Sequence, residues 1–237
     1  MSQPPVIITR AQPGATATAA HLAEMGIGSI VSPALNLQLK KPVPEIPLLG
    51  ASGVLFTSAN GVRFFSEVSA DRSLQAWCVG PSTAAAARDA GFAIVHNADG
   101  NSEDLAELVI AWSNPKSGHF VHVANTAAGS ILRDRLLDAG FEIEFVGLYE
   151  PVEAVRLSPA AEDALRADAA VCVLIHSAKG ASSFAKLCAE FEGVQITFIC
   201  VSDKAAEPIK RLGHVRVADR PNETALLSLV RDWHRTL

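Results

Sequence analysis

The stretch Val54-Leu55-Phe56-Thr57-Ser58-Ala59-Asn60-Gly61-Val62-Arg63-Phe64 decides how the chain folds. Its apolar run stops abruptly after Phe56 at small and polar residues, and a helical pattern follows. This pattern predicts a buried strand, a tight turn and the N-terminus of a helix. Such a turn exposes hydroxyls and backbone N–H groups, which suit a bound anion or carboxylate.

The same phrase recurs in the second half of the chain as Val173-Leu174-Ile175-His176-Ser177-Ala178-Lys179-Gly180. Three more segments match others about half the chain away: 77–80 matches 198–202, 101–109 matches 222–230, and 7–32 matches 121–146. The near-constant spacing of these matches indicates two similar α/β units.

Short apolar runs alternate with helical patterns along the whole chain. The predicted strands are 6–9, 29–32, 53–57, 76–79, 93–96, 119–123, 142–149, 170–176, 196–201 and 215–218. The predicted helices are about 14–25, 60–68, 82–90, 102–111, 127–139, 179–190, 203–211 and 223–235. This alternation is typical of parallel sheets covered by helices on both faces.

Two extended runs interrupt this alternation. Residues 35–47 alternate apolar and polar side chains and end with three prolines, and residues 142–155 contain Pro151. Proline removes a ladder donor and holds the chain extended, so these runs are typical of linker strands. Their pairing would give a two-stranded connection, with one domain lying roughly within residues 41–147.

The composition excludes several classes of protein. Apolar residues make up 49% of the chain and the net charge is −5, with no basic run, so we expect neither a nucleic-acid nor a membrane partner. The N-terminus lacks a signal-peptide pattern and no apolar run approaches about 18 residues, so a cytoplasmic location is expected. The four cysteines lack metal-ligand spacing and are predicted to be buried free thiols: Cys78, Cys172, Cys188 and Cys200.

The candidate ligand contacts lie at the strand-to-helix turns, because open parallel sheets bind ligands beyond the carboxyl ends of their strands. These turns carry hydroxyls, amides and a few cations, which suit a ligand with several carboxylates. The candidates from this inventory are Arg10, Asn60, Asn125, Lys179 and Lys204. The alternative is that the polar residues only cap helices. Phosphate-loop, dinucleotide, zinc-protease and nucleophile-elbow motifs are absent from the sequence.

Tyr149 is the only tyrosine in the chain and ends the apolar run 145–149. At that position a phenol can face a cleft between two domains and donate a proton or a hydrogen bond. Ordinary packing at a strand end explains it equally well.

The sequence resembles the uroporphyrinogen-III synthase family. The resemblance is carried, in the order and spacing of the family, by residues 6–13, 55–62, 79–84, 100–106, 148–150 and 177–180. It covers nearly the whole chain. It implies two flavodoxin-like domains joined by a two-stranded ladder: 1–36 with 155–237, and 41–149, with connector strands 37–40 and 150–154.

The resemblance also implies an activity. A family member closes hydroxymethylbilane, a linear tetrapyrrole with eight carboxylates, to uroporphyrinogen III with inversion of the last ring and loss of water. It uses no metal or organic cofactor, and we expect a monomer. Tyr149 matches a tyrosine proposed to assist departure of the hydroxyl, and three residues match polar cleft positions: Ser58, Thr83 and Ser177. This sequence differs from the family pattern at the turn 202–204, where many members have a Gly-Pro-Thr-Thr-like sequence.

Two other functions are compatible with the residues. One is a two-domain binding or regulatory module that closes on an anionic metabolite without chemistry, which the variant turn 202–204 favours. The other is a nucleotide-dependent α/β enzyme, which the missing phosphate loop disfavours.

Overall fold

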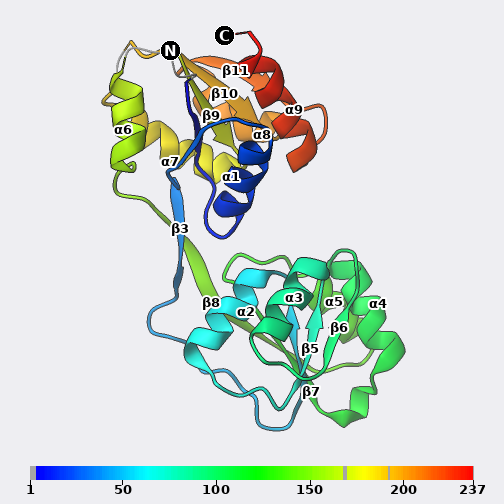
Figure 1. Ribbon diagram of the computed structural model, residues 1–237. Coiled ribbons are helices and arrows are strands. Elements are labelled where there is room, and N and C mark those ends of the chain that lie inside the picture. Colours follow the sequence, from blue (N-terminus) through cyan, green and yellow to red (C-terminus); the bar gives the residue numbers. More distant parts are fainter. Residues whose placement is uncertain (1–3, 168–169, 192, 237) are drawn as a thin grey trace. The chain divides into compact units, whose positions relative to one another are not determined.

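The computed structural model describes residues 4–167, 170–191 and 193–236 (Figure 1). The chain divides into two compact units, each with its own sheet. Unit 1 lies within residues 1–37 and 152–237, and unit 2 comprises residues 38–151.

Unit 1 is a five-stranded parallel sheet with helices on both faces. Its elements are β1 (Val6–Ile8), α1 (Gly14–Glu24), β2 (Ser29–Val31), α6 (Pro159–Arg166), β9 (Val171–Ile175), α7 (Ala178–Cys188), β10 (Ile196–Cys200), α8 (Asp203–Ala206), a 3-10 helix (Glu207–Ile209), β11 (His214–Val217) and α9 (Glu223–His234). The strand order is β11-β10-β9-β1-β2.

The core of unit 1 follows from the alternation of side chains along β1. Val6 and Ile8 pack in the cluster that includes Leu22 of α1 and Trp233 of α9, whereas Ile7 packs in the opposite cluster with Phe184 of α7. Because successive strand residues point to opposite faces, a strand covered on both faces is apolar throughout. All three β1 residues are fully buried.

Unit 2 contains β4 (Ala51–Phe56), α2 (Ala59–Val68), β5 (Gln75–Cys78), α3 (Pro81–Asp89), β6 (Val95–Asn97), α4 (Ser102–Trp112), a 3-10 helix (Pro115–Ser117), β7 (His119–Asn125), α5 (Ile131–Asp138) and most of β8 (Ile143–Glu153). Its sheet has the order β3-β8-β7-β4-β5-β6, where β3 is Leu35–Leu39. The Lys40 N–H donates to the Leu148 carbonyl at 2.9 Å. A ladder joining the domains, and the domain limits expected from the sequence, stay predictions.

The core of unit 2 is also two-sided. On one face, Leu55 and Trp77 pack with Leu105 of α4 and Leu132 of α5. On the other, Phe56 meets Phe65 of α2 edge-to-face, with ring centroids 5.7 Å apart.

The two sheets share one topology. Read from β2, unit 1 has the order β2-β1-β9-β10-β11, and the corresponding strands of unit 2 run β8-β7-β4-β5-β6. This pairing matches β7 with β1 and β4 with β9, as the sequence matches predict. In unit 1 the chain order of the strands is 2-1-3-4-5, which is flavodoxin-like, and unit 2 has the same arrangement with a rotated starting point. The predicted fold class is confirmed.

Two predicted helices differ from the structure, and one helix of the structure was not predicted. Helix α6 has no counterpart in the prediction, because it is short and buries only Ala161 and Leu165. The helix predicted at 127–139 begins at Ile131, since the Ala127 N–H bonds the Asn125 side chain at 2.8 Å in a turn. The helix predicted at 203–211 ends at Ala206 and continues as a 3-10 turn, because Pro208 disrupts the α-helical ladder.

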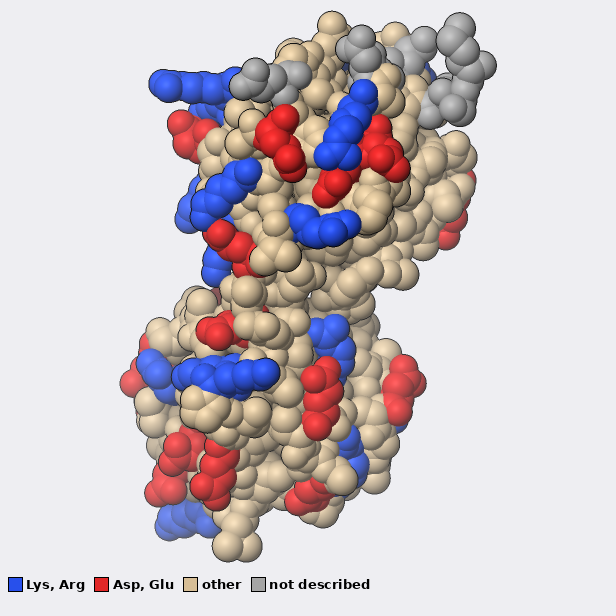
Figure 2. All heavy atoms as spheres, turned by 90° about the vertical axis from the view of Figure 1, so that its left-hand side faces the viewer, with Lys and Arg blue, Asp and Glu red and all other residues tan. Residues whose placement is uncertain are grey.

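The surface and helices of the described residues give two further findings. On the face in Figure 2, Lys and Arg side chains are interspersed with Asp and Glu and do not merge into one basic area. Among the residues that the structure covers, no helix combines the length and apolar character needed to cross a membrane. The four cysteines are buried and free, as predicted.

Candidate active site

Each sheet has one point where the direction of strand addition reverses. In unit 1 this point lies between β1 and β9, and in unit 2 it lies between β7 and β4. Ligands of open α/β sheets bind beyond the carboxyl ends of the strands at this point. The residues at or directly after the ends of these four strands are polar or charged: Thr9-Arg10, His176-Ser177, Asn125-Thr126 and Thr57-Ser58.

In unit 2 the structure places Tyr149 in β8, beside the end of β7. The Thr126 N–H donates to its carbonyl at 2.8 Å, and its ring stacks on Phe64 of α2 with centroids 4.7 Å apart. Tyr149 is 4% exposed. Burial raises the pKa of its phenol, while a hydrogen bond with Ser58 and the charge of Arg63 act in the opposite direction. The phenol therefore keeps its proton at neutral pH and is a hydrogen-bond donor.

Ser58 caps α2 and contacts Tyr149. Its hydroxyl oxygen accepts a bond from the Asn60 N–H at 3.2 Å and also bonds the Tyr149 phenol. The Asn60 side-chain oxygen is buried without a hydrogen-bond partner. At Gly61 a Cβ would lie 2.8 Å from the Val123 carbonyl oxygen, so only glycine lets α2 begin this close to β7. The Ser58 hydroxyl, which caps the N-terminus of α2, thus lies beside the phenol.

The residue before Ser58 is held by a buried histidine. Thr57 Oγ1 lies 3.2 Å from Nε2 of His122, which is 2% exposed. Burial, and then the charge of Arg133, lower the pKa of His122 to about 4. The imidazole is therefore neutral at physiological pH and supports the Thr57 turn without adding charge.

Two other predicted contacts in unit 2 are occupied within the protein. Asn125 ends β7, and its side-chain oxygen accepts the Ala127 N–H. Thr83 lies in the first turn of α3 and is 2% exposed, so its side chain is covered by protein.

In unit 1 a carboxylate gathers residues from three other elements. Glu223, the first residue of α9, receives a bond from Arg10 Nη1 at 3.0 Å and from the Thr18 hydroxyl at 2.5 Å. Its Oε2 also lies 3.3 Å from Nε2 of His176. Arg10 is thus paired with an internal carboxylate, which the sequence analysis did not foresee.

The Glu223 carboxylate is ionised. Its partial burial raises its pKa, but hydrogen bonds from His176 and Thr18, followed by the charges of His176 and Arg10, outweigh that effect and hold the pKa at about 2. Its position at the start of α9 also favours negative charge.

The remaining predicted contacts of unit 1 lie on exposed first turns. Ser177 caps α7 by accepting the Gly180 N–H at 3.1 Å, and Lys179 follows it on the same turn. Ser202 caps α8 by accepting the Ala205 N–H at 3.3 Å, and Lys204 is exposed beside it.

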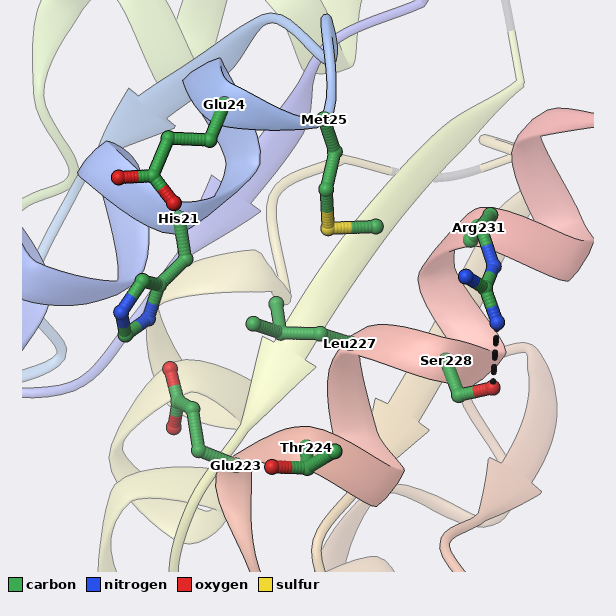
Figure 3. Close-up of a pocket in the computed structure, with 8 residues that line it drawn as sticks. All are labelled: His21, Glu24, Met25, Glu223, Thr224, Leu227, Ser228 and Arg231. Atoms are coloured by element: carbon green, nitrogen blue, oxygen red, sulfur yellow. Dashed lines mark hydrogen bonds between the residues drawn. The ribbon is translucent and has the colours of Figure 1, made fainter.

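A groove of about 390 Å³ runs between α1 and α9 from Glu223 (Figure 3). His21 and Met25 line it from α1, and Leu227 and Arg231 line it from α9. Arg231 turns toward Ser228, and Leu227 points into the groove (Figure 3). The groove adjoins Glu223 and its partners. Its lining combines acidic and basic side chains with apolar ones.

The sequence matches the family model described as uroporphyrinogen-III synthase HemD over residues 16–228. The chain belongs to the uroporphyrinogen-III synthase family. Members of this family are cyclising lyases of tetrapyrrole biosynthesis. No curated protein sequence matches the chain significantly.

A solved structure from the uroporphyrinogen-III synthase family has the same fold. The crystal structure of the uroporphyrinogen-III synthetase from Helicobacter pylori is similar with a TM-score of 0.62 and 15% identity, and the match covers 97% of this chain and 99% of that one. A Thermus thermophilus uroporphyrinogen-III synthase matches at a TM-score of 0.45 and 18% identity, over 98% and 97% of the two chains.

The structure adds three residues to the candidate site of this uroporphyrinogen-III synthase family member that the sequence did not predict: Glu223, Phe64 and Arg63. The Arg63 guanidinium carbon lies 4.3 Å from the centroid of the Phe64 ring, which in turn stacks on Tyr149. The only available signal was position, since Arg63 and Phe64 follow the Ser58 turn and Glu223 follows the Asn222 cap. Among the described residues, no cluster of three or more His, Cys, Asp or Glu could hold a metal ion.

Proposed function

We propose that the chain closes hydroxymethylbilane to uroporphyrinogen III, with inversion of the last pyrrole ring and loss of water. Family membership over residues 16–228 is the observation that carries this proposal. The shared topology of the two sheets supports it. Each sheet supplies polar turns at its switch point, the point where the direction of strand addition reverses.

In this reaction the pyrroles supply the reactivity and the protein supplies geometry. Loss of the hydroxyl gives an electrophilic azafulvene, and the far pyrrole attacks it through its substituted carbon to give a spiro intermediate. A hundredfold preference for the inverted product needs only about 2.7 kcal/mol of differential transition-state binding. Hydrogen bonds distributed over several carboxylates are sufficient for such a preference.

Tyr149 is the proposed donor to the departing hydroxyl. Its raised pKa keeps the phenol protonated, and the Phe64 ring and the Ser58 hydroxyl restrict its orientation. A phenol held this way donates a hydrogen bond to a leaving oxygen without prior ionisation.

The substrate carboxylates are proposed to contact the polar turns of both units. The residues are Ser58, Asn60, Thr83 and Asn125 in unit 2, and Arg10, Ser177, Lys179 and Lys204 in unit 1. Ser177, Lys179 and Lys204 have the most support, because they are exposed on helix first turns. Thr83 has the least, because it is 2% exposed. We further propose a cytoplasmic monomer that needs neither metal nor organic cofactor and binds neither nucleic acid nor membrane.

The test is the isomer ratio of the product. Freshly prepared hydroxymethylbilane is incubated with the protein, with heat-denatured protein and with buffer, and the oxidised uroporphyrins are separated by chromatography. The proposal predicts mainly isomer III with the native protein and mainly isomer I in both controls. Equal ratios in all three reactions would overturn it. Substrate binding by calorimetry with unchanged ratios would instead favour a non-catalytic binding module.

A further inference from the structure

The Glu223 carboxylate is the meeting point of four elements of unit 1. Arg10 follows β1, Thr18 lies on α1 and His176 follows β9, and each has an atom within 3.3 Å of a Glu223 oxygen. Thr18 is fully buried, so its hydroxyl requires an acceptor, and the carboxylate provides it. One carboxylate therefore connects the two strand ends at the switch point of this sheet.

Glu223 fixes the Arg10 side chain. Nη1 of Arg10 bonds Glu223 at 3.0 Å and also lies 3.4 Å from the Thr18 hydroxyl, so one nitrogen has two anchors. The guanidinium lies over Gly14, where a Cβ would stand 2.5 Å from Nε. Arg10 has five N–H donors, and Nη1 supplies only the bonds to these two anchors. The side chain is still 36% exposed, so other donors remain available to a ligand carboxylate.

Glu223 also holds a proton on Nε2 of His176. An ionised carboxylate only accepts, so the hydrogen bond at 3.3 Å requires a proton on Nε2. Nδ1 of His176 is buried and has no hydrogen-bond partner in the described structure. The carboxylate is thus the partner that sets the orientation of this ring.

Unit 2 has no carboxylate–imidazole pair at the matching position. Asn222 caps α9 and Asn101 caps α4, so Glu223 corresponds to Ser102, and His176 corresponds to Thr57. The carboxylate and its imidazole partner are therefore particular to unit 1. Simple helix capping does not require them, because α4 is capped without a carboxylate at this position.

We propose that Glu223 is a positioning residue for the cyclisation reaction: it holds the Arg10 guanidinium and the Nε2-protonated form of His176 at the ends of β1 and β9, so that Arg10 meets a substrate carboxylate in a fixed orientation. This inference rests on the proposed function. It concerns substrate binding and differs from the role of Tyr149 in departure of the hydroxyl.

The decisive variant is Glu223→Gln, which keeps the shape and an acceptor for Thr18 but removes the charge. The matched control is Glu103→Gln, an exposed carboxylate in the first turn of α4. In steady-state assays of the full chain, Glu223→Gln raises KM about tenfold and changes kcat less than twofold, as expected for loss of a charge-assisted contact. Glu103→Gln behaves as wild type. Wild-type KM in Glu223→Gln overturns the proposal.

A double variant tests whether Glu223 acts through Arg10. Arg10→Gln raises KM to a similar extent, and the combination with Glu223→Gln raises it no further, since both changes break one unit. Effects that multiply would contradict the proposed coupling. If Glu223→Gln does not fold, Glu223→Asp replaces it, because the shorter side chain keeps the charge but cannot span Arg10 and His176 together; wild-type KM in that variant is equally contradictory.

A spectroscopic readout is independent of turnover. Long-range ¹H–¹⁵N spectra of histidine-labelled protein, assigned with His176→Asn, are expected to show His176 protonated at Nε2 in wild type and a mixture of tautomers in Glu223→Gln. An unchanged tautomer would overturn this part of the proposal. If wild type itself leaves the isomer ratio unchanged, the proposed function fails and the positioning role with it. If wild type forms isomer III and Glu223→Gln is indistinguishable from it, only the positioning role fails.

Discussion

The ring of Tyr149 stacks on the ring of Phe64 with centroids 4.7 Å apart and planes inclined by 18°. Phe64 lies on α2, whose N-terminal cap is Ser58, and Tyr149 lies on β8. The stack therefore links the one phenol of the chain to the helix that begins at the Ser58 turn. Phe64 packs against the face of the Tyr149 ring, and Ser58 forms a hydrogen bond with the Tyr149 hydroxyl.

Removal of the Tyr149 hydroxyl tests its role in the reaction. Tyr149→Phe keeps the ring and its stack on Phe64 and loses only the hydrogen bond to Ser58, so we expect the melting temperature to fall by no more than a few degrees. Turnover falls at least about tenfold because the donor to the leaving hydroxyl is lost, while KM changes little. The check is kcat and KM for hydroxymethylbilane. Wild-type turnover in this variant would remove Tyr149 from the mechanism.

Loss of the stack itself is expected to act mainly on stability. Phe64→Leu removes the aromatic pairing but keeps an apolar side chain, which destabilises unit 2 by about 1–2 kcal/mol. Differential scanning calorimetry measures this change, with Leu108→Ala on α4 as a comparison away from the stack. Turnover measured well below the melting transition falls as well, since the phenol is less well oriented; full turnover would show that the stack is only structural.

Acid sensitivity of unit 1 is expected from Glu223. Its folded pKa, about 2, lies below the ordinary value of 4.5, so the stabilisation it provides is complete above about pH 4.5 and is lost as the pH falls toward 2. After allowance for solvent screening, this amounts to about 1–2 kcal/mol. Chemical denaturation of wild type and Glu223→Gln between pH 7 and pH 3 measures it. The difference in unfolding free energy narrows with falling pH; a constant difference would contradict the assignment.

Gly14 offers a way to move Arg10 without changing any charge. A Cβ at this position would lie 2.5 Å from Arg10 Nε, and that flexible side chain is what has to yield. Gly14→Ala is therefore expected to raise KM several-fold while the melting temperature stays level or rises, because alanine favours helix. Gly28→Ala, where a Cβ meets no atom within 4 Å, is the control. Equal KM in both variants would separate Arg10 from substrate binding.

The fold was accessible to sequence reasoning because its signals are local. The Asn101 side chain caps α4 through hydrogen bonds to residues two and three positions further on, and Pro81 lies in the first turn of α3 as predicted. Buried strands such as β9 are apolar from end to end. The internal match between 54–64 and 173–180 also identified strands that hold the same place in two sheets.

The site was accessible only in part, because its contacts join distant segments. Arg10 was a predicted carboxylate contact, but its pairing with Glu223 depends on a fold that brings together residues more than two hundred positions apart. The stack of Phe64 on Tyr149 likewise depends on how α2 lies against β8. Helix α6 escaped prediction for the opposite reason, since its eight residues give too short a pattern.

The discontinuity of unit 1 has a consequence for synthesis on the ribosome. Ile7 of β1 pairs with Val173 of β9, whereas residues 38–151 of unit 2 are continuous. As the chain emerges from its N-terminus, unit 2 completes its sheet while β9, β10 and β11 are still to be made. Throughout that interval β1, which is fully buried in the finished protein, can pair with β2 but not yet with β9. β1 is therefore made before unit 2 but is paired along both of its edges only after β9 has followed.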